Sequence, residues 1–305
     1  MNKKKYVNRN YLTTTRIIAL GFLITVIVGT ILLSLPIASA NGTWTDLLTA
    51  AFTSTTSVCV TGLVVVDTFS YWSLFGKGVI LILIQIGGLG IVSIITLFML
   101  LFRMKITLKS TMLLQDAFNL NSKQGLLKFT IKVIKGTFLI EGIGAFIYSF
   151  YYCREYGLLK GIWFSVFHAV SAFCNAGLDI MGADSLIPYH SNLLMMLNTS
   201  FLIIMGGIGF IVWWDTVEAF RRIRTKKCSI RSAWNGVHLQ TKIAIFMTLL
   251  LLIGGTVVIY FLERSNPDTL GNLSDSTHND QKRSIQHHQK IGMVRNRIYC
   301  MVGYG

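Results

Sequence analysis

The sequence has few charged residues. Asp, Glu, Lys and Arg make up 13% of its 305 residues, whereas hydrophobic residues make up 52%. Soluble domains typically carry about 25% charged residues. The shortfall argues against a soluble protein and indicates that lipid surrounds much of the chain.

Signatures of several other protein classes are also missing. The five cysteines are an odd number without zinc-type spacing, and Cys59 and Cys174 lie in apolar stretches, where we expect them to act as small apolar side chains. No Ser-His-Asp arrangement or phosphate-binding loop is visible, so we predict neither an enzyme nor a cofactor. The basic start leads into a full-length apolar run without a small-residue cleavage site, which argues against a cleaved signal peptide.

Long apolar runs are what the sequence does contain. About 20 helical residues cross a bilayer, and we predict five spans, at residues 17–35, 79–101, 130–152, 193–214 and 243–262. Two shorter pieces, residues 46–57 and 162–173, suit re-entrant helices, and Thr43 and Asp46 have capping-box spacing at the start of the first. Because non-helical backbone at membrane depth must be shielded from lipid, the segments after these pieces should line something wet.

The basic residues lie in blocks between the apolar runs. A net charge of +15 is compatible with nucleic-acid binding, but blocks that precede the first span and fill alternate connections follow the positive-inside rule. We therefore predict no nucleic-acid partner, a lipid bilayer as the surroundings and a cytoplasmic N-terminus. The block at residues 221–231 could bind anionic lipid or a cytosolic partner, although its role as an orientation signal explains it sufficiently.

Two pairs of segments repeat along the chain. Residues 59–63 (Cys-Val-Thr-Gly-Leu) resemble residues 174–178 (Cys-Asn-Ala-Gly-Leu) at an offset of 115, and residues 85–90 (Gln-Ile-Gly-Gly-Leu-Gly) resemble residues 204–209 (Ile-Met-Gly-Gly-Ile-Gly) at an offset of 119. Two matches at nearly equal offset indicate an internal repeat. The sequence therefore predicts an all-α membrane protein of potassium-channel-like units, each a helix, a re-entrant helix, a filter loop and a helix. Two units are complete, and a third has its first helix.

The predicted unit has a physical use. A re-entrant helix points the negative end of its dipole at a pore axis, and the segment after it can offer backbone carbonyls in place of a cation's water shell. Gly62 and Gly177 would permit the turn, although each could be a simple turn glycine. The Gly-Gly-x-Gly runs could be hinges or could allow close helix packing.

Four polar residues near or within the spans need an interpretation. Glu141 lies deep in a predicted span, where an acid is a functional candidate by default. It could bind a coupling proton or sodium ion, pair with a polar group on a neighbouring helix, or sit in a water-filled crevice. We expect Asp215 and Glu218 to pair locally with the nearby arginines, and His168 to pack or hydrogen-bond within its helix.

At these residues the sequence resembles the Trk/Ktr/HKT superfamily of potassium transporters, and within it the bacterial Ktr-type membrane subunit. The resemblance covers about residues 10–274. It is carried by residues 29–36 (Gly-Thr-Ile-Leu-Leu-Ser-Leu-Pro), 52–63 (Phe-Thr-Ser-Thr-Thr-Ser-Val-Cys-Val-Thr-Gly-Leu), 167–179 (Phe-His-Ala-Val-Ser-Ala-Phe-Cys-Asn-Ala-Gly-Leu-Asp) and the two Gly-Gly-x-Gly runs.

The resemblance implies four repeats around one pore, each with one filter glycine. Carried over by position, the ion-binding filter residues are Val60, Thr61, Gly62, Asn175, Ala176 and Gly177. Glycine at the first position resembles the potassium-selective type, although sodium transport remains an alternative. The resemblance also implies a bacterial plasma membrane, a homodimer and a ring of cytosolic nucleotide-binding regulatory subunits.

These predictions divide the chain into seven parts. They are a cytoplasmic N-terminus (1–15), pore repeat one (16–102), a cytoplasmic loop (103–128), pore repeat two (129–220), a second loop (221–241), the start of repeat three (242–274) and a polar tail (275–305). Because the resemblance stops after Ser274, we expect a disordered tail and hypothesise a truncated or frameshifted product. The histidines of the tail lack the regular spacing of a metal site.

The sequence favours potassium uptake by a pore-forming subunit. One alternative is a proton- or sodium-coupled secondary transporter, but such folds usually have inverted repeats, whereas both units here start and end on the same side. The other alternative is an inactive fragment of the pore subunit.

Overall fold

A computed structural model describes residues 14–90, 93, 126–182, 185–186, 189, 192–226 and 229–263. The predictions for most of the N-terminus, for the loop at 103–125 and for the polar tail therefore lie outside the described residues. Within the described ranges the chain is helical, and the only β-bridge joins Ser39 to Trp72, which confirms the predicted all-α class. The elements are α1 (Thr14–Ser34), the 3-10 helix η1 (Pro36–Ala38), α2 (Leu47–Cys59), α3 (Thr68–Tyr71), α4 (Leu74–Leu89), α7 (Leu126–Tyr156), α8 (Leu158–Phe173), α9 (Leu193–Gly207), α10 (Phe210–Lys226), α11 (Ile230–Asn235) and α12 (Leu239–Glu263).

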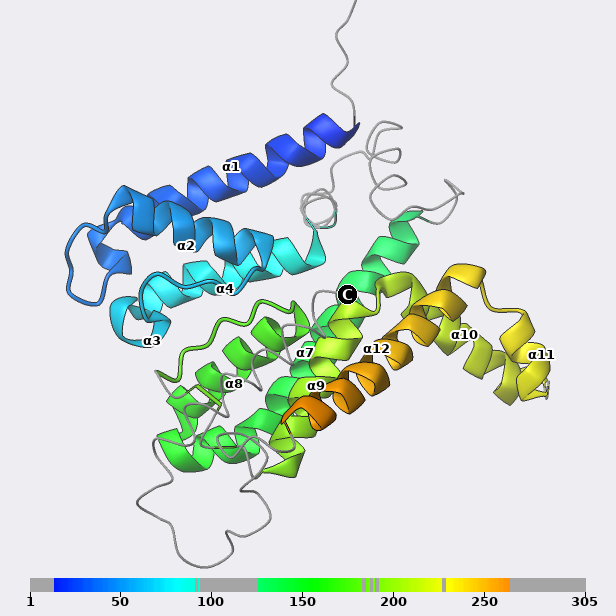
Figure 1. The fold of residues 1–305 in the computed structure, drawn as a ribbon. Helices are drawn as coiled ribbons and strands as arrows, with labels where there is room; N and C mark the ends of the chain where they lie inside the picture. The colour runs from blue at the N-terminus through cyan, green and yellow to red at the C-terminus, as the bar shows by residue number, and fades with distance from the viewer. Residues whose placement is uncertain are drawn as a thin grey trace, which may run out of the picture.

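Six of these helices form two groups of three (Figure 1). In the first unit α1, α2 and α4 contact one another, and in the second unit α7, α8 and α9 do the same. Each unit is a helix, a shorter apolar helix and a further helix, in that order. Contacts between α4 and α8 join the two units.

Polar residues at the helix starts explain where the first unit's elements begin. The Asp46 carboxylate accepts hydrogen bonds from the backbone N–H groups of Leu48 and Thr49, at 3.2 and 3.4 Å, and so caps the start of α2. The predicted capping box placed Asp46 inside the helix, whereas it stands just before it. The Ser73 hydroxyl accepts from the N–H of Gly76 at 3.2 Å, so α4 begins at Leu74, five residues before the predicted span.

The first two helices of the second unit, α7 and α8, are longer than the sequence predicts. Helix α7 has 31 residues, and a single residue, Gly157 at φ 80°, connects it to α8. At Gly161 a Cβ atom would lie 2.5 Å from the backbone N and Cα of Cys153. The missing side chain therefore lets α8 fold back tightly against the end of α7.

The predicted continuous helix over residues 193–214 is wrong. The structure has two helices there, α9 and α10, and their axes are bent by 102°. Gly209 lies between them at φ 94°, a conformation that glycine adopts readily. Helix α10 then continues to Lys226, beyond the predicted end of the second repeat at residue 220.

Two predicted spans are long and apolar enough to cross a membrane within the described residues, and a third qualifies only if α9 and α10 count as one span. Thr130–Tyr156 and Leu239–Leu262 pass that test alone, and α9 with α10 passes it as a bent pair. The first predicted span contains the shorter apolar helix Ile18–Ser34, and the second continues past Leu89 into residues that are not described.

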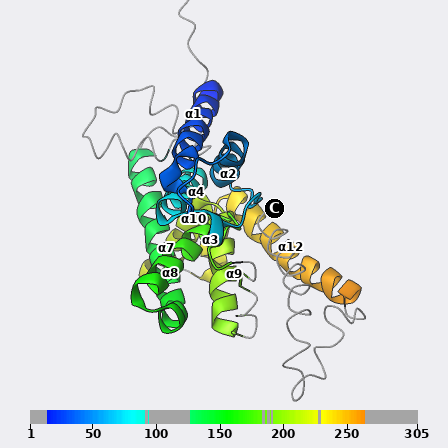
Figure 2. The ribbon, with the colours of Figure 1, turned by 90° about the vertical axis from the view of Figure 1, so that its left-hand side faces the viewer.

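Apolar side chains also cover much of the outside. Figure 2 shows α12 projecting from the side of the molecule, and most of its large apolar side chains are exposed. In water such a surface would be unfavourable, whereas in lipid it is expected. The fold is that of a membrane protein.

Candidate ion-conduction site

The chain makes a left-handed turn where α2 ends. Val60 lies at φ 57° and ψ 45°, and Gly62 at φ 73°. The N–H of Thr61 donates to the carbonyl oxygen of Thr56 at 3.0 Å, which closes the last turn of the helix in the manner of a Schellman cap. The prediction placed the turn at Gly62, but the turn starts two residues earlier, at a valine.

The chain takes the same path where α8 ends. Asn175 lies at φ 60° and Gly177 at φ 64°. The N–H of Ala176 donates to the carbonyl oxygen of Ser171 at 2.8 Å. Since Thr56 and Ser171 stand 115 residues apart, like Val60 and Asn175, the repeat of the sequence is also a repeat of the backbone.

Two hydroxyl groups hold these segments, and the sequence analysis gave neither of them a role. Thr56 Oγ1 accepts from the N–H of Leu63 at 3.0 Å and lies 2.6 Å from Thr61 Oγ1. Ser171 Oγ donates to the carbonyl oxygen of Leu178. Both bonds join a residue in the last helical turn to the residue seven positions later. Their equal place in the repeat was the signal that could have revealed them.

The segments after α2 and α8 meet at their glycines. A Cβ atom on Gly62 would lie 2.7 Å from the carbonyl oxygen of Ala176 and 3.6 Å from Gly177 Cα. A side chain at Gly62 is therefore excluded twice, by the left-handed backbone and by the facing segment. Residues 60–62 and 175–177 therefore lie against each other at the C-terminal ends of α2 and α8, where both helix dipoles favour a cation.

The Gly-Gly-x-Gly runs allow close helix packing, one of the two purposes that the sequence left open, and the hinge stays a prediction. A Cβ atom on Gly87 would overlap the carbonyl oxygen of Val58, and one on Gly206 would overlap that of Phe173. These glycines let α4 and α9 pack directly against the ends of α2 and α8. The last glycine of each run, Gly90 or Gly209, has a positive φ and stands just beyond the end of its helix.

Glu141 is buried at the junction of the two units. Its side chain lies on α7 in a residue only 4% exposed, and the amide of Gln85 on α4 donates to both of its oxygens, at 3.0 and 3.2 Å. The thiol of Cys174, the first residue after α8, lies 4.0 Å away. Of the alternatives for Glu141, a polar partner on a neighbouring helix is the one with observed contacts.

His168 packs within the second unit, as expected. Its Nδ1 lies 3.0 Å from the carbonyl oxygen of Phe164, one turn earlier. The rings of Tyr148, Tyr152 and Phe167 surround the imidazole. His168 therefore joins the short helix α8 to α7.

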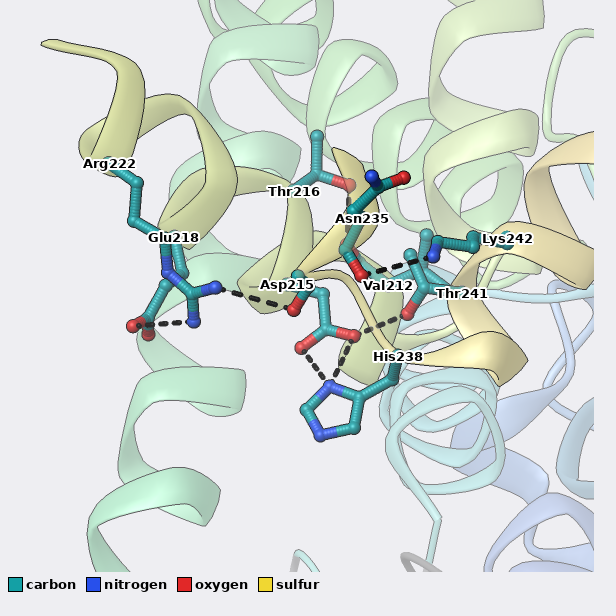
Figure 3. Close-up of polar contacts among 10 residues, drawn as sticks. Val212, Asp215, Thr216, Glu218, Arg222, Asn235, His238, Thr241 and Lys242 are labelled. Carbon is teal, nitrogen blue, oxygen red and sulfur yellow. Dashed lines mark hydrogen bonds and ion pairs between the residues drawn. The ribbon is translucent and has the colours of Figure 1, made fainter. Parts of the chain in front are cut away.

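Ion pairs and hydrogen bonds join α10 to the chain that follows it (Figure 3). Asp215 accepts from Thr241 Oγ1 at 2.6 Å, and its second contact is His238 Nδ1 at 2.9 Å. Glu218 pairs with Arg222 at 3.3 Å, as expected, whereas Asp215 pairs with His238 instead of an arginine. Among the described residues no group of three His, Cys, Asp or Glu could hold a metal ion.

Comparisons with known proteins bear on this arrangement. The family model TrkH, described as "Cation transport protein", matches residues 3–302, farther than Ser274, where the resemblance of the motifs ended. The chain is 40% identical over 257 residues to the Potassium/sodium uptake protein NtpJ of Enterococcus hirae, covering 84% of this chain and 54% of the relative. It is 37% identical over 274 residues to the Ktr system potassium uptake protein B of Bacillus subtilis, covering 90% and 58%. The protein of that name from Vibrio alginolyticus is 33% identical over 259 residues, covering 85% and 54%. The chain thus spans about half the length of the curated relatives it matches.

Proposed function

The chain belongs to the TrkH family of cation transport proteins, and from that premise we propose that it forms part of a pore for potassium uptake. The ion would lose part of its water shell to the main-chain carbonyls of residues 60–62 and 175–177. No side-chain chemistry is needed, so the function proposed is transport and not catalysis.

The observation that carries this proposal is the juxtaposition of Gly62 and Gly177. Two segments with left-handed turns, each held by a hydroxyl group of the preceding helical turn, lie against each other there. We propose that their main-chain carbonyl groups face the ion path. Carbonyl rings of this kind replace a cation's hydration in potassium channels. The helix ends behind both segments add a favourable negative potential.

Sodium is the second cation to consider. One relative is named a potassium/sodium uptake protein, whereas two are named for potassium alone. Glycine at positions 62 and 177 leaves the carbonyl groups as the available ligands, which favours the larger, more easily dehydrated potassium ion. We therefore propose potassium as the preferred ion.

The names of the relatives suggest the assembly that we propose. Two of the relatives are named as parts of a Ktr system, and we propose a homodimer that works with a cytosolic nucleotide-binding regulatory subunit. The basic blocks favour a plasma-membrane protein with its N-terminus in the cytoplasm.

For Glu141 we propose a structural role instead of ion coupling. A carboxylate that receives two hydrogen bonds from one amide is already engaged. A coupled transporter would instead require this residue to exchange a proton or a sodium ion during each cycle. Uptake that depends on pH through Glu141 would favour the coupled mechanism.

Uptake by a bacterium that lacks its own potassium-uptake systems tests the proposal. Cells that express this chain should regain growth at low potassium, and Gly62→Ser should abolish potassium uptake or reduce its preference over sodium. The matched control is Gly78→Ser, because Gly78 on α4 has no atom within 4 Å of a Cβ position. A correctly inserted chain without any uptake would instead identify an inactive fragment.

A further inference from the structure

We propose that α10 lies in the membrane–water interface and that the face formed by Val217, Phe220, Arg221 and Arg224 binds lipids with anionic headgroups. We call this face the lipid face of α10. The inference rests on the location of the chain in a membrane and is independent of which ion the chain conducts.

The direction of α10 is the first argument. Helix α9 belongs to a predicted span, and spanning helices are tilted by about 20° on average from the membrane normal. Because α10 is bent from α9 by 102°, it must run close to the membrane plane. Figure 1 shows α10 turning away from the line of α9 at the end where α1, α7 and α12 begin.

The exposed residues of α10 are the second argument. Val217 is 55% exposed and Phe220 is 67% exposed, and Arg221 and Arg224 are also exposed. Spacings of three and four residues place all four on one side of the helix. Apolar side chains interleaved with arginines are typical of interfacial helices, because the apolar groups enter the acyl region while the guanidinium groups reach the headgroups.

The opposite side of α10 is occupied by the protein itself (Figure 3). Asp215 is bonded to Thr241 and His238, and Arg222 donates to the carbonyl oxygen of Gly236 at 3.3 Å. These bonds fix the rotation of the helix about its axis. The lipid face therefore points away from α11 and α12.

Lys132 and Trp214 mark the depth of the helix, whereas Trp213 is buried in the protein. Trp213 Nε1 donates to the carbonyl oxygen of Met205 at 2.8 Å, which holds the first turn of α10 against the end of α9. Lys132 Nζ lies 5.4 Å from the ring centroid of Trp214. Tryptophan and lysine gather at membrane interfaces, so this end of the molecule is where headgroups are expected.

Charge selects the lipid. Glu218 is paired with Arg222 on the other side, so the lipid face carries two arginines and no acid. Each basic residue near an anionic surface is expected to increase affinity about fivefold. Lipids such as phosphatidylglycerol match this face better than zwitterionic ones.

The first experiment locates α10 in vesicles that contain only the full chain. A spin label is attached to a genetically encoded keto amino acid at position 217, 220 or 218. In phosphatidylcholine vesicles with phosphatidylglycerol, labels at 217 and 220 should collide with lipid-soluble oxygen, and the label at 218 with a water-soluble nickel chelate. Labels at 217 and 220 that meet mainly the nickel chelate would overturn the proposal, because this face would then point to water.

The second experiment tests the headgroup. Native mass spectrometry of the purified chain measures the binding of phosphatidylglycerol. Arg224→Gln should weaken this binding about fivefold. Arg154→Gln removes the same charge from the last turn of α7, at the other end of the molecule, and should change it little. Equal loss in both variants, or equal binding of phosphatidylcholine, would overturn the assignment. Neither experiment requires ion uptake.

Discussion

The side-chain amide of Gln85 donates to both carboxylate oxygens of Glu141, at 3.0 and 3.2 Å, and so joins α4 of the first unit to α7 of the second. The contact lies beside Cys174, at the start of the segment that carries Gly177. Because a buried polar group without a partner is costly, this bond favours one docked arrangement of the two units.

Removing the carboxylate should destabilise the docked units. Glu141→Ala leaves the Gln85 amide unpaired in a buried site, and we expect a loss of about 1–3 kcal/mol of stability. Exchanging the two groups, Gln85→Glu with Glu141→Gln, should restore most of it, because the donor and acceptor remain opposite each other. Thermal unfolding of the detergent-solubilised variants measures both effects. Failure of the exchange to improve on Glu141→Ala would contradict the pairing.

A methyl group on Gly206 should be harmful. Gly206→Ala places a Cβ atom on the carbonyl oxygen of Phe173, so α9 must move away from α8, and overpacking of this kind costs about 1–3 kcal/mol. Gly255→Ala on α12 is the matched control, since no atom lies within 4 Å of its Cβ position. Equal melting temperatures of the two variants would show that α9 does not pack on Phe173 as described.

Removing the hydroxyl of Thr56 should change the ion preference more than removing the hydroxyl of Thr55. Thr56→Val keeps the side-chain shape but removes the acceptor of the Leu63 N–H, a bond worth about 1 kcal/mol. We expect a lower preference for potassium over sodium in uptake assays. Thr55→Val removes a hydroxyl that bonds only within its own helix, to Ala51, and should leave the preference unchanged. The same loss in both variants would argue against a role for the Thr56 bond.

Acid should weaken the cap of α3. Partial burial alone would raise the pKa of Asp67, but hydrogen bonds from the Ser70 side chain and from the N–H groups of Ser70 and Phe69 outweigh it and hold the pKa below its ordinary value of 3.8. A carboxylate with a depressed pKa adds stability above the unfolded-state pKa, and this is lost as the pH falls through the folded-state value. Asp67→Asn should therefore lower the melting temperature at pH 7, and this difference should shrink as the pH falls below 3.8. A constant difference across that range would contradict this assignment.

The sequence predicted the elements that depend on length and composition. Helices α2 and α8 were expected from apolar pieces too short to span, and the turns after them from the repeat that contains Gly62 and Gly177. The common offset of 115 residues also predicted two segments of similar structure, because similar sequences in similar surroundings adopt similar backbone conformations.

Features that depend on tertiary contacts were missed. The break at Gly209 falls in a run that is apolar throughout, and glycine is frequent in uninterrupted membrane helices. Val60 was not expected in a left-handed conformation, because its branched Cβ makes that conformation costly. The bond between Asp215 and Thr241 joins residues 26 positions apart and required the fold of α10 against α12.

The bond between Gln85 and Glu141 has no counterpart in the duplicated positions. Ile204 stands 119 residues after Gln85, and the residues 115 and 119 positions before Glu141 are Val26 and Phe22. The two units thus share a common architecture but differ in this pair of an amide and a carboxylate. Interchanging the two units would separate this amide from this acid, so the pair specifies the order of the units.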